Sequence, residues 1–166
     1  LGRIPPGQVS KQLTNTTDIF ATVASVVGYR LPDDVAVDSF DMLPAMLGIQ
    51  DEDDSIRPHM LTQSFRAQFQ IRQGNWKYLD HRGSGGNNYG KGILEKYAIP
   101  ETAPQATGQL FNLADDPGET TNLFFTESLK REEMQALLKT LTPKEAGRSA
   151  PKNREPIGIE NIPRLK

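Results

Sequence analysis

The chain contains no cysteine among its 166 residues, and it has only two histidines. The absence of cysteine excludes a disulfide bond, a thiolate ligand for a metal ion and a cysteine nucleophile. Neither histidine has an acidic residue at the spacing typical of metal ligands, so the sequence predicts no metal site in this chain. No serine has an evident base beside it either, which leaves a self-contained Ser-His-Asp site unsupported.

Excess charge and long apolar runs are also missing. The formal net charge is -2, whereas a general nucleic-acid binder usually has a basic excess, so no nucleic-acid partner is expected. No apolar run approaches the ~20 residues of a membrane-spanning helix. The 14 glycines and 12 prolines instead predict a globular chain that is rich in turns and loops.

Several short segments with alternating apolar residues predict an antiparallel sheet. The segments 69–71 and 76–78 form the arms of a hairpin around a Gly-Asn turn, and a third strand is expected over residues 109–113. Residues 60–65 are a further strand candidate. Trp76, Phe111 and Phe124 are expected in the core.

Three helices are expected. The first begins after a cap at Asn15 or Thr16 and ends at Gly28, and the second covers residues 42–47 after Asp41 and ends at Gly48. The first helix has a wide apolar face made of Ile19, Phe20, Val23, Val26 and Val27. A face this wide needs a large partner surface.

The third helix is expected to begin after a cap at Thr126. Its apolar stripe consists of Met134, Leu137, Leu138 and Leu141. The fold class is therefore α+β, with a small antiparallel sheet packed by a long C-terminal helix. Residues 143–166 contain several prolines and no periodic pattern, so we expect a tail that wraps a surface or stays mobile.

Two ligand motifs are incomplete. The acidic run 51–54 begins like a calcium loop, but Ile56 stands where glycine is needed and Thr62 where glutamate is needed. The run 85–91 fits most of a phosphate-binding loop, but Gly92 replaces the Ser or Thr that would hold magnesium. We interpret the first as a surface loop and the second as a loop that shapes the rim of a cleft.

The run 115–119 reads Asp-Asp-Pro-Gly-Glu, which resembles a pair of catalytic carboxylates. Proline fixes φ and glycine permits a positive φ, so the Asp-Pro-Gly sequence is typical of a turn. We predict a structural turn here.

Two segments carry a resemblance to a known family. They are 71–77, Ile-Arg-Gln-Gly-Asn-Trp-Lys, and 116–123, Asp-Pro-Gly-Glu-Thr-Thr-Asn-Leu. With residues 2–9, 17–22 and 43–48 in the same order, they resemble the C-terminal region of formylglycine-dependent, arylsulfatase-like sulfatases of the alkaline phosphatase superfamily. The likeness extends from Leu1 to about Pro151.

The resemblance implies that the last helices of an α/β alkaline-phosphatase-like domain, itself absent, precede the sheet. We accordingly divide the chain into residues 1–54, the end of that catalytic domain, residues 55–142, the sulfatase C-terminal subdomain, and the Pro-rich tail 143–166. The first residues lack an initiator Met and a signal-peptide core, so we expect a piece of a longer polypeptide.

The resemblance implies a formylglycine nucleophile and a calcium ion for the full-length enzyme, with all of their residues upstream. No catalytic residue, metal ligand or cofactor is therefore assigned to this chain. Family nucleophiles mature within a Cys/Ser-x-Pro-x-Arg pattern. After Ser149, Arg154 falls one residue too late for that pattern, and the stretch lies in the tail, so it is rejected as a catalytic site.

The polar residues expected at the open end of the sheet are candidates for the rim of a substrate pocket. Amide, imidazole, guanidinium and phenol groups suit sugar hydroxyls and anions. The candidates are Gln63, Ser64, His81, Arg82, Asn87, Asn88 and Tyr89.

We therefore expect the C-terminal part of a sulfatase, partnered by the upstream catalytic domain of the same polypeptide. The whole enzyme would act on a sulfated small molecule or glycan. The alternatives are a free-standing, non-catalytic binding module, and part of a phospho- or phosphonate esterase of the same superfamily. An exported location, periplasmic or extracellular, is suggested by the resemblance alone.

Overall fold

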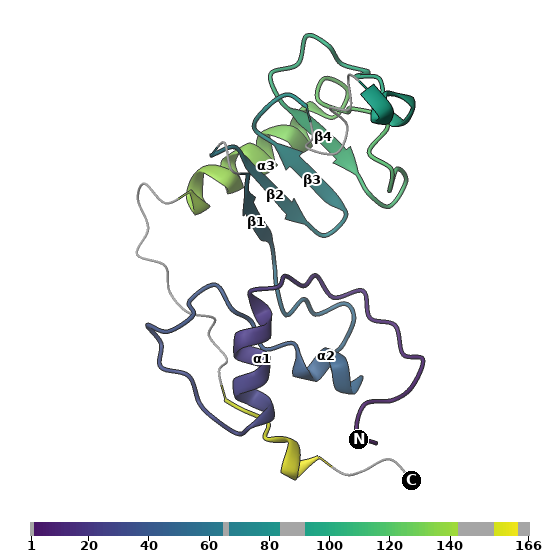
Figure 1. Cartoon of the computed structure of the whole chain (residues 1–166). Helices are drawn as coiled ribbons and strands as arrows, with labels where there is room; N and C mark the ends of the chain where they lie inside the picture. Colours follow the sequence, from purple (N-terminus) through teal and green to yellow (C-terminus); the bar gives the residue numbers. More distant parts are fainter. Residues whose placement is uncertain (1, 65–66, 84–91, 143–154, 163–166) are drawn as a thin grey trace. The chain divides into compact units, whose positions relative to one another are not determined.

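The chain divides into two units, which are described separately. A computed structural model describes residues 2–64, 67–83, 92–142 and 155–162 (Figure 1). Unit 1 consists of Leu1–Pro58 and Gly147–Lys166, and unit 2 of His59–Ala146. Among the described residues, no helix has the length and apolar character needed to cross a membrane.

Unit 2 contains one four-stranded antiparallel sheet, as the sequence predicted. Its strands are β1 (Met60–Gln63), β2 (Phe69–Gln73), β3 (Trp76–Leu79) and β4 (Gln109–Asn112). The spatial order β1-β2-β3-β4 follows the chain, and every neighbouring pair is antiparallel.

The turn between β2 and β3 requires a glycine at position 74. Gln73 pairs with Trp76, so Gly74 and Asn75 form a two-residue loop. The φ angle of Gly74 is +54°, a value that glycine adopts without the steric cost of a Cβ atom. The turn therefore fixes the register that carries Ile71 and Tyr78 to the same face.

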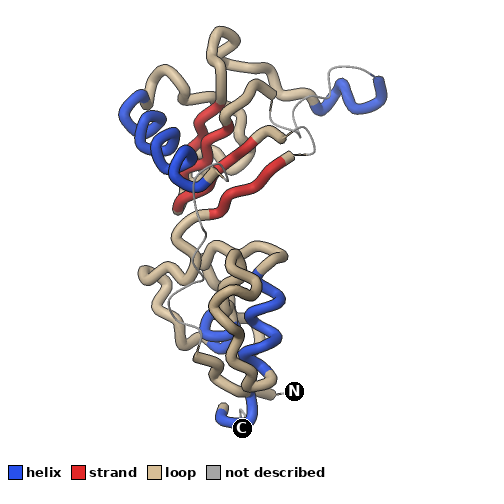
Figure 2. Tube along the Cα trace, turned by 90° about the vertical axis from the view of Figure 1, so that its left-hand side faces the viewer, coloured by secondary structure: helices blue, strands red, loops and turns tan. Residues whose placement is uncertain are grey.

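Helix α3 (Ser128–Leu141) covers one face of this sheet (Figure 2). In register, Ile71 lies opposite Tyr78 and Tyr78 opposite Leu110, which gives an apolar row across three strands. Met134 and Leu138 of α3 pack onto this row. The expected α+β arrangement of a small sheet and a long helix is thus confirmed.

Two local predictions in unit 2 are wrong. Thr126 does not cap α3, which begins at Ser128, because the Thr126 hydroxyl donates instead to the carbonyl oxygen of Leu123 at 3.3 Å. In the acidic turn, the positive φ, +54°, is that of Glu119 rather than Gly118. Hydrogen bonds to the Asp116 carboxylate hold the turn.

Unit 1 contains the helices α1 (Asp18–Val26) and α2 (Leu43–Leu47). Gly28 and Gly48 follow them with φ of +71° each, as the stop signals predicted. The predicted cap of α2 at Asp41 is wrong, because the cap position is Met42. The Asp41 carboxylate still accepts a hydrogen bond from the Leu43 amide at 2.9 Å.

The predicted cap of α1 is wrong. The cap position is Thr17, and its side chain makes no capping bond. The Asn15 side chain accepts from the amide of Thr17 at 3.4 Å, and Thr17 lies one residue before the helix, so this bond does not satisfy an amide of the helix itself.

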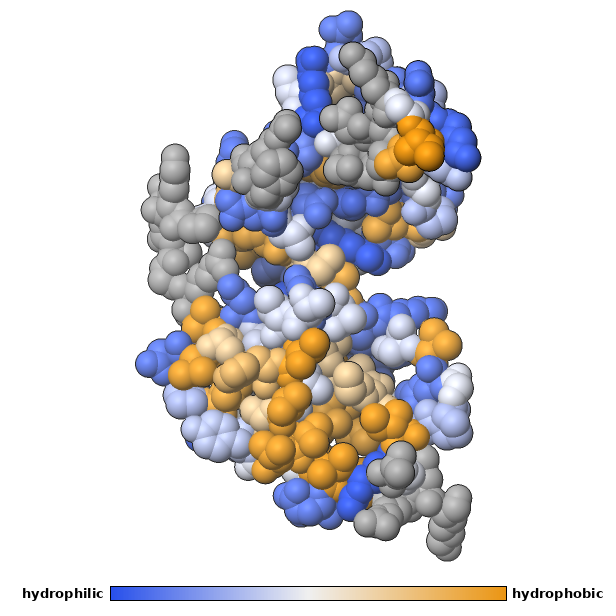
Figure 3. Space-filling model, in the orientation of Figure 1, coloured by the Kyte–Doolittle hydropathy of each residue, from blue (hydrophilic) through white to orange (hydrophobic). Residues whose placement is uncertain are grey.

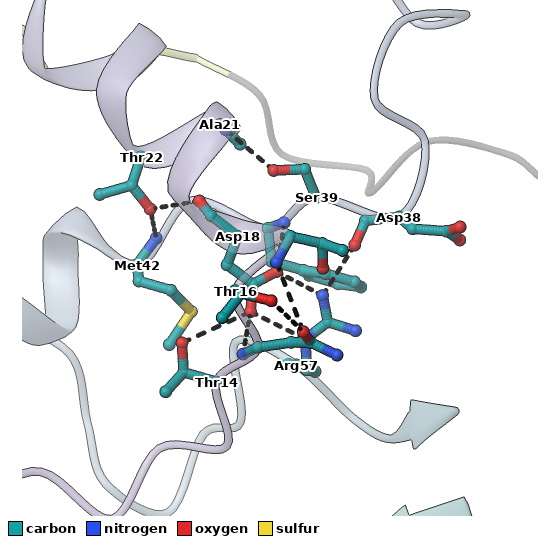
Figure 4. Close-up of polar contacts among 12 residues, drawn as sticks. Thr14, Thr16, Asp18, Ala21, Thr22, Asp38, Ser39, Met42 and Arg57 are labelled. Carbon is teal, nitrogen blue, oxygen red and sulfur yellow. Dashed lines mark hydrogen bonds and ion pairs between the residues drawn. The ribbon is translucent and has the colours of Figure 1, made fainter. Parts of the chain in front are cut away.

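The inward face of α1 is small and polar rather than apolar. Its buried residues are Asp18, Ala21, Thr22 and Ser25. The Asp18 carboxylate accepts two hydrogen bonds from the Arg57 guanidinium, one of them from Nε at 3.0 Å, and both side chains are buried (Figure 4). The Phe40 amide also donates to Asp18, at 2.9 Å. The wide apolar stripe of α1 consequently lies on the outward face.

Part of the predicted tail packs within unit 1. The Ile157 amide donates to the Ser25 hydroxyl at 3.1 Å, and the Gly158 amide donates to the Ser25 carbonyl oxygen at 2.9 Å. Residues 155–162, which include a short 3-10 turn over Ile159–Asn161, therefore border the C-terminal end of α1.

Candidate functional site

The four rim candidates that the structure describes lie at the same end of the sheet. Gln63 ends β1, and His81 and Arg82 follow the end of β3. Because β1 and β3 run in the same direction in this order of strands, their ends lie at the same edge. Asn87, Asn88 and Tyr89 lie outside the described residues, as do the phosphate-loop run 85–91 and the stretch 149–154.

The end of β1 is exposed. Gln63 and Ser64 are exposed, and the Ser64 amide donates to the Gln68 carbonyl oxygen at 2.8 Å. The Ser64 hydroxyl lies 3.3 Å from the Gln68 side-chain oxygen, to which it donates. These groups can offer hydroxyl and amide contacts to a ligand at the sheet edge.

The end of β3 carries two basic side chains. Nδ1 of His81 lies 3.0 Å from the carbonyl oxygen of Arg82. Nε of Arg82 donates to the carbonyl oxygen of Ala106 at 2.8 Å, which holds the guanidinium beside the segment that leads into β4. Among the described residues, no carboxylate lies within ion-pair distance of Arg82.

The two groups of candidates do not form one contact set. Strands are spaced roughly 4.8 Å apart, so β1 and β3 lie about 10 Å from each other. Arg82 lines a pocket of about 320 Å³, whereas Gln63, Ser64 and His81 do not. The structure therefore brings Arg82 to a pocket and leaves the other three along the sheet edge.

Besides Arg82, the polar residues that line this pocket are Glu101, Thr102, Gln109, Glu119, Thr120 and Asn122. Three of them, Glu101, Gln109 and Asn122, form a hydrogen-bonded cluster that the sequence analysis missed. The Glu101 carboxylate accepts from the Gln109 side chain at 2.6 Å, from the Asn122 side chain at 2.9 Å and from the Ala103 amide at 2.8 Å. Burial raises the pKa of Glu101, but these hydrogen bonds outweigh it and hold the pKa below its ordinary value. The pocket therefore presents an ionised carboxylate at neutral pH.

The sequence held little signal for these residues. Gln109 begins a predicted strand and Asn122 lies within a family-like segment, but neither position indicates a pocket. Glu101 stands in a loop between Pro100 and Pro104 and meets the other two only through the fold.

The two family-like segments are joined by structural contacts. The Lys77 ammonium group donates to the Glu119 carboxylate at 2.6 Å. Asp116 accepts from the amides of Thr120 and Thr121, and these bonds hold its pKa below the ordinary value although burial acts in the opposite direction. Asp116 thus builds a turn, as predicted.

Asn122 completes the outer edge of β4. Its side-chain oxygen accepts from the amides of Leu110 and Phe124, at 3.0 and 3.1 Å, and its side-chain nitrogen lies 3.3 Å from the Gly108 carbonyl oxygen. The asparagine amide therefore takes the place of a neighbouring strand.

No metal centre is evident in the described part of the chain, where no group of three His, Asp or Glu side chains is positioned to hold an ion. Calcium, the metal ion implied for a full-length enzyme, therefore has no ligand set among the described residues.

The chain is similar to curated proteins named as sulfatases. It is 32% identical over 152 residues to an N-acetylgalactosamine-6-sulfatase of Canis lupus familiaris, a match that covers 86% of this chain and 27% of that protein. It is 29% identical over 111 residues to an N-acetylgalactosamine-6-O-sulfatase of Bacteroides thetaiotaomicron, which covers 67% of this chain and 20% of that protein. The chain thus spans about a quarter or less of the length of these relatives.

A solved structure agrees with this result. A sulfatase from Bacteroides thetaiotaomicron, described in connection with the metabolism of multiple glycosaminoglycans, has a TM-score of 0.54 and 27% identity to this chain. The match covers 75% of this chain and 24% of that protein. No protein-family model matches the chain.

Proposed function

Because the chain has the sequence and the fold of a sulfatase C-terminal region, we propose that it is the C-terminal part of an enzyme that hydrolyses sulfate esters, aryl or glycan. In this proposal, unit 1 completes the fold of the catalytic domain and unit 2 shapes the rim of the substrate pocket. The nucleophile and the calcium ligands belong to the upstream part of the same polypeptide.

The observation that carries the proposal is the outward apolar face of α1. Ile19, Phe20, Val23 and Val27 are each more than half exposed. Figure 3 shows apolar side chains gathered over unit 1. Each of these side chains would gain about 1.5–3 kcal/mol from full burial, so a covering surface would stabilise the unit strongly.

The upstream catalytic domain is the proposed cover. The matched relatives are about three times as long as the chain, which supplies the required extra surface. A free-standing binding module is less favoured because it would leave this face in water. A phospho- or phosphonate esterase is less favoured because the matched relatives are named as sulfatases.

The role of unit 2 follows from the polar end of its sheet. We propose that Gln63, Ser64, His81 and Arg82 contact the part of the substrate that leaves with the alcohol oxygen, and that Asn87, Asn88 and Tyr89 extend this rim. Contacts with this remote part of the substrate act on binding rather than on the attack at sulfur. They matter more for a large glycan than for a small aryl sulfate.

The experiment compares kinetics in the full-length protein. Arg82→Ala or His81→Ala should raise KM for a sulfated glycan several-fold more than KM for an aryl sulfate. Arg72→Ala is the matched control, because Nε of Arg72 also donates to a backbone carbonyl, that of Gly74 at 3.0 Å. Equal effects of Arg82→Ala on both substrates would contradict the role at the rim.

A second experiment tests the division of labour. The 166-residue chain should release no sulfate from an aryl sulfate in the presence of calcium, because it lacks the nucleophile and the residues that stabilise charge. Turnover above a buffer control that persists through further purification would contradict the proposal.

The apolar face gives a third experiment. The isolated chain should bind a hydrophobic dye or self-associate, and Phe20→Lys with Val23→Lys should reduce both, since these positions are exposed. Leu129→Lys is the control, because Leu129 is 83% exposed and stands alone on α3. A monomer that binds no dye would count against the proposed cover.

A further inference from the structure

The pocket beside Arg82 lies on the face of the sheet that α3 does not cover. Leu110 faces α3, so its neighbours Gln109 and Phe111 face the opposite way, and both line the pocket. Its volume of about 320 Å³ falls in the range of small-molecule sites. Strand β4 forms the floor of the pocket. It is held on one side by its pairing with β3 and on the other by the side chain of Asn122.

One wall of the pocket is cationic. The Arg82 guanidinium is held by the bond from its Nε to Ala106, and the other two nitrogens have no partner among the described residues. A guanidinium oriented in this way suits a planar or tetrahedral anion, to which it can donate two hydrogen bonds.

The other wall accepts hydrogen bonds. The Glu101 carboxylate is fixed by its three donors and is exposed. Gln109 is 4% exposed, and its side-chain oxygen has no hydrogen-bond partner among the described residues. An unpaired buried acceptor destabilises the fold, so a donor from a ligand would offset this cost.

These two walls require a ligand with an anionic group and several hydroxyl donors. An inorganic anion satisfies Arg82 but is repelled by Glu101, and a neutral sugar satisfies Glu101 but leaves Arg82 unpaired. We propose that the pocket binds one acidic sugar unit of a glycan, with its sulfate or carboxylate group at Arg82 and its hydroxyl groups at Glu101 and Gln109. The choice of a glycan rests on the proposed function.

Direct binding to the 166-residue chain tests this proposal. The probe is a chondroitin 6-sulfate tetrasaccharide, titrated by calorimetry and by NMR, with cellotetraose and inorganic sulfate as comparators. The acidic tetrasaccharide should bind more tightly than either comparator and should shift the amide signals of Thr102, Gln109 and Thr120. Arg82→Ala should weaken binding by about tenfold or more, whereas Arg72→Ala should leave it unchanged.

A second variant probes the acceptor wall. Glu101→Gln should also weaken binding, with its folding checked by the fluorescence of Trp76, the only tryptophan. If Glu101→Gln fails to fold, the comparison of Arg82→Ala with Arg72→Ala decides the outcome alone.

Three results would overturn the proposal. They are absence of tetrasaccharide binding, equal binding of cellotetraose, and a loss on Arg82→Ala no larger than on Arg72→Ala. These measurements use a chain without the catalytic residues, so their failure leaves the sulfatase proposal to be decided by the kinetics of the full-length protein.

Discussion

The two units use an amphipathic helix in opposite ways. In unit 2, α3 turns its apolar stripe inward, and Met134 and Leu138 are buried on the sheet. In unit 1, α1 turns its apolar stripe outward and buries Asp18, Thr22 and Ser25. Apolar periodicity therefore shows that a helix face seeks cover, but not which part of the protein covers it.

Burial in the two units follows the same contrast. Of the fifteen large hydrophobic side chains that are exposed in the described residues, ten belong to unit 1, whereas ten of the sixteen buried hydrophobic residues belong to unit 2. Unit 2 thus contains a core of its own, and unit 1 is held together to a larger extent by polar contacts.

The largest effect is expected from breaking the buried ion pair of unit 1. Asp18→Ala leaves the Arg57 guanidinium buried without its carboxylate, which should destabilise unit 1 by about 3–5 kcal/mol. Hydrogen exchange of the α1 amides measures this loss. Asp33→Ala serves as a control, since Asp33 is exposed. Unchanged protection of α1 in Asp18→Ala would show that apolar packing, not the polar network, holds unit 1.

A matched pair of apolar truncations tests the comparison directly. Met134→Ala should destabilise unit 2 by about 2–5 kcal/mol, because it opens a cavity at a fully buried site. Phe20→Ala should change the stability of unit 1 in this chain by no more than about 0.5 kcal/mol, because the ring is 56% exposed. Denaturant unfolding followed by Trp76 reports the first change, and hydrogen exchange of α1 reports the second. Comparable losses would contradict the outward assignment of the α1 stripe.

The edge of β4 provides a smaller effect. Asn122→Ala leaves the amides of Leu110 and Phe124 without their acceptor, which should destabilise unit 2 by about 1–3 kcal/mol. Asn75→Ala, in the exposed hairpin turn, is the control. If both variants unfold at the wild-type denaturant concentration, Asn122 does not act as a substitute strand.

The smallest effect is a difference in pH dependence between the units. The pKa of Asp116 in unit 2 is lowered by its bonds to Thr120 and Thr121, so its contribution to stability is present above the ordinary pKa of 3.8 and is lost as pH falls below it. The pKa of Asp41 in unit 1 is raised by burial, so its ionisation opposes folding, and this cost disappears as pH falls through the raised pKa.

Thermal unfolding of Asp116→Asn and Asp41→Asn between about pH 3 and pH 6 measures how each carboxyl group changes the stability with pH. Asp116→Asn should be less stable than wild type at the upper end of this range, and the difference should shrink on acidification. The pH-dependent part of the Asp41→Asn difference should have the opposite sign. Parallel curves for the two variants would refute the assignment.

The sequence predicted the local elements because their signals are local. Glycines with positive φ ended α1 and α2 and formed the hairpin turn, and alternating apolar residues located the strands. The predicted caps at Asn15, Thr16, Asp41 and Thr126 were wrong. Short polar side chains can bond to backbone groups near a helix end without occupying the cap position, and the sequence does not distinguish these choices.

The pocket residues were beyond prediction for a different reason. Glu101, Gln109 and Asn122 are separated by up to 21 positions in the chain and come from a loop, a strand and a turn. The side-chain amides of Gln109 and Asn122 reach the Glu101 carboxylate only because of the register of β4 and the path of the segment 99–106.

By itself, the sequence determined the α+β class, the hairpin, the apolar stripes and the family resemblance, because propensity and periodicity act over a few residues. Only the tertiary structure decided that the apolar stripe of α1 lies on the outward face. It also decided that Asp18 pairs with Arg57, 39 positions along the chain, and that Arg82 and Glu101 line the same pocket. These outcomes depend on long-range contacts, in which burial and charge pairing between distant segments outweigh local preference.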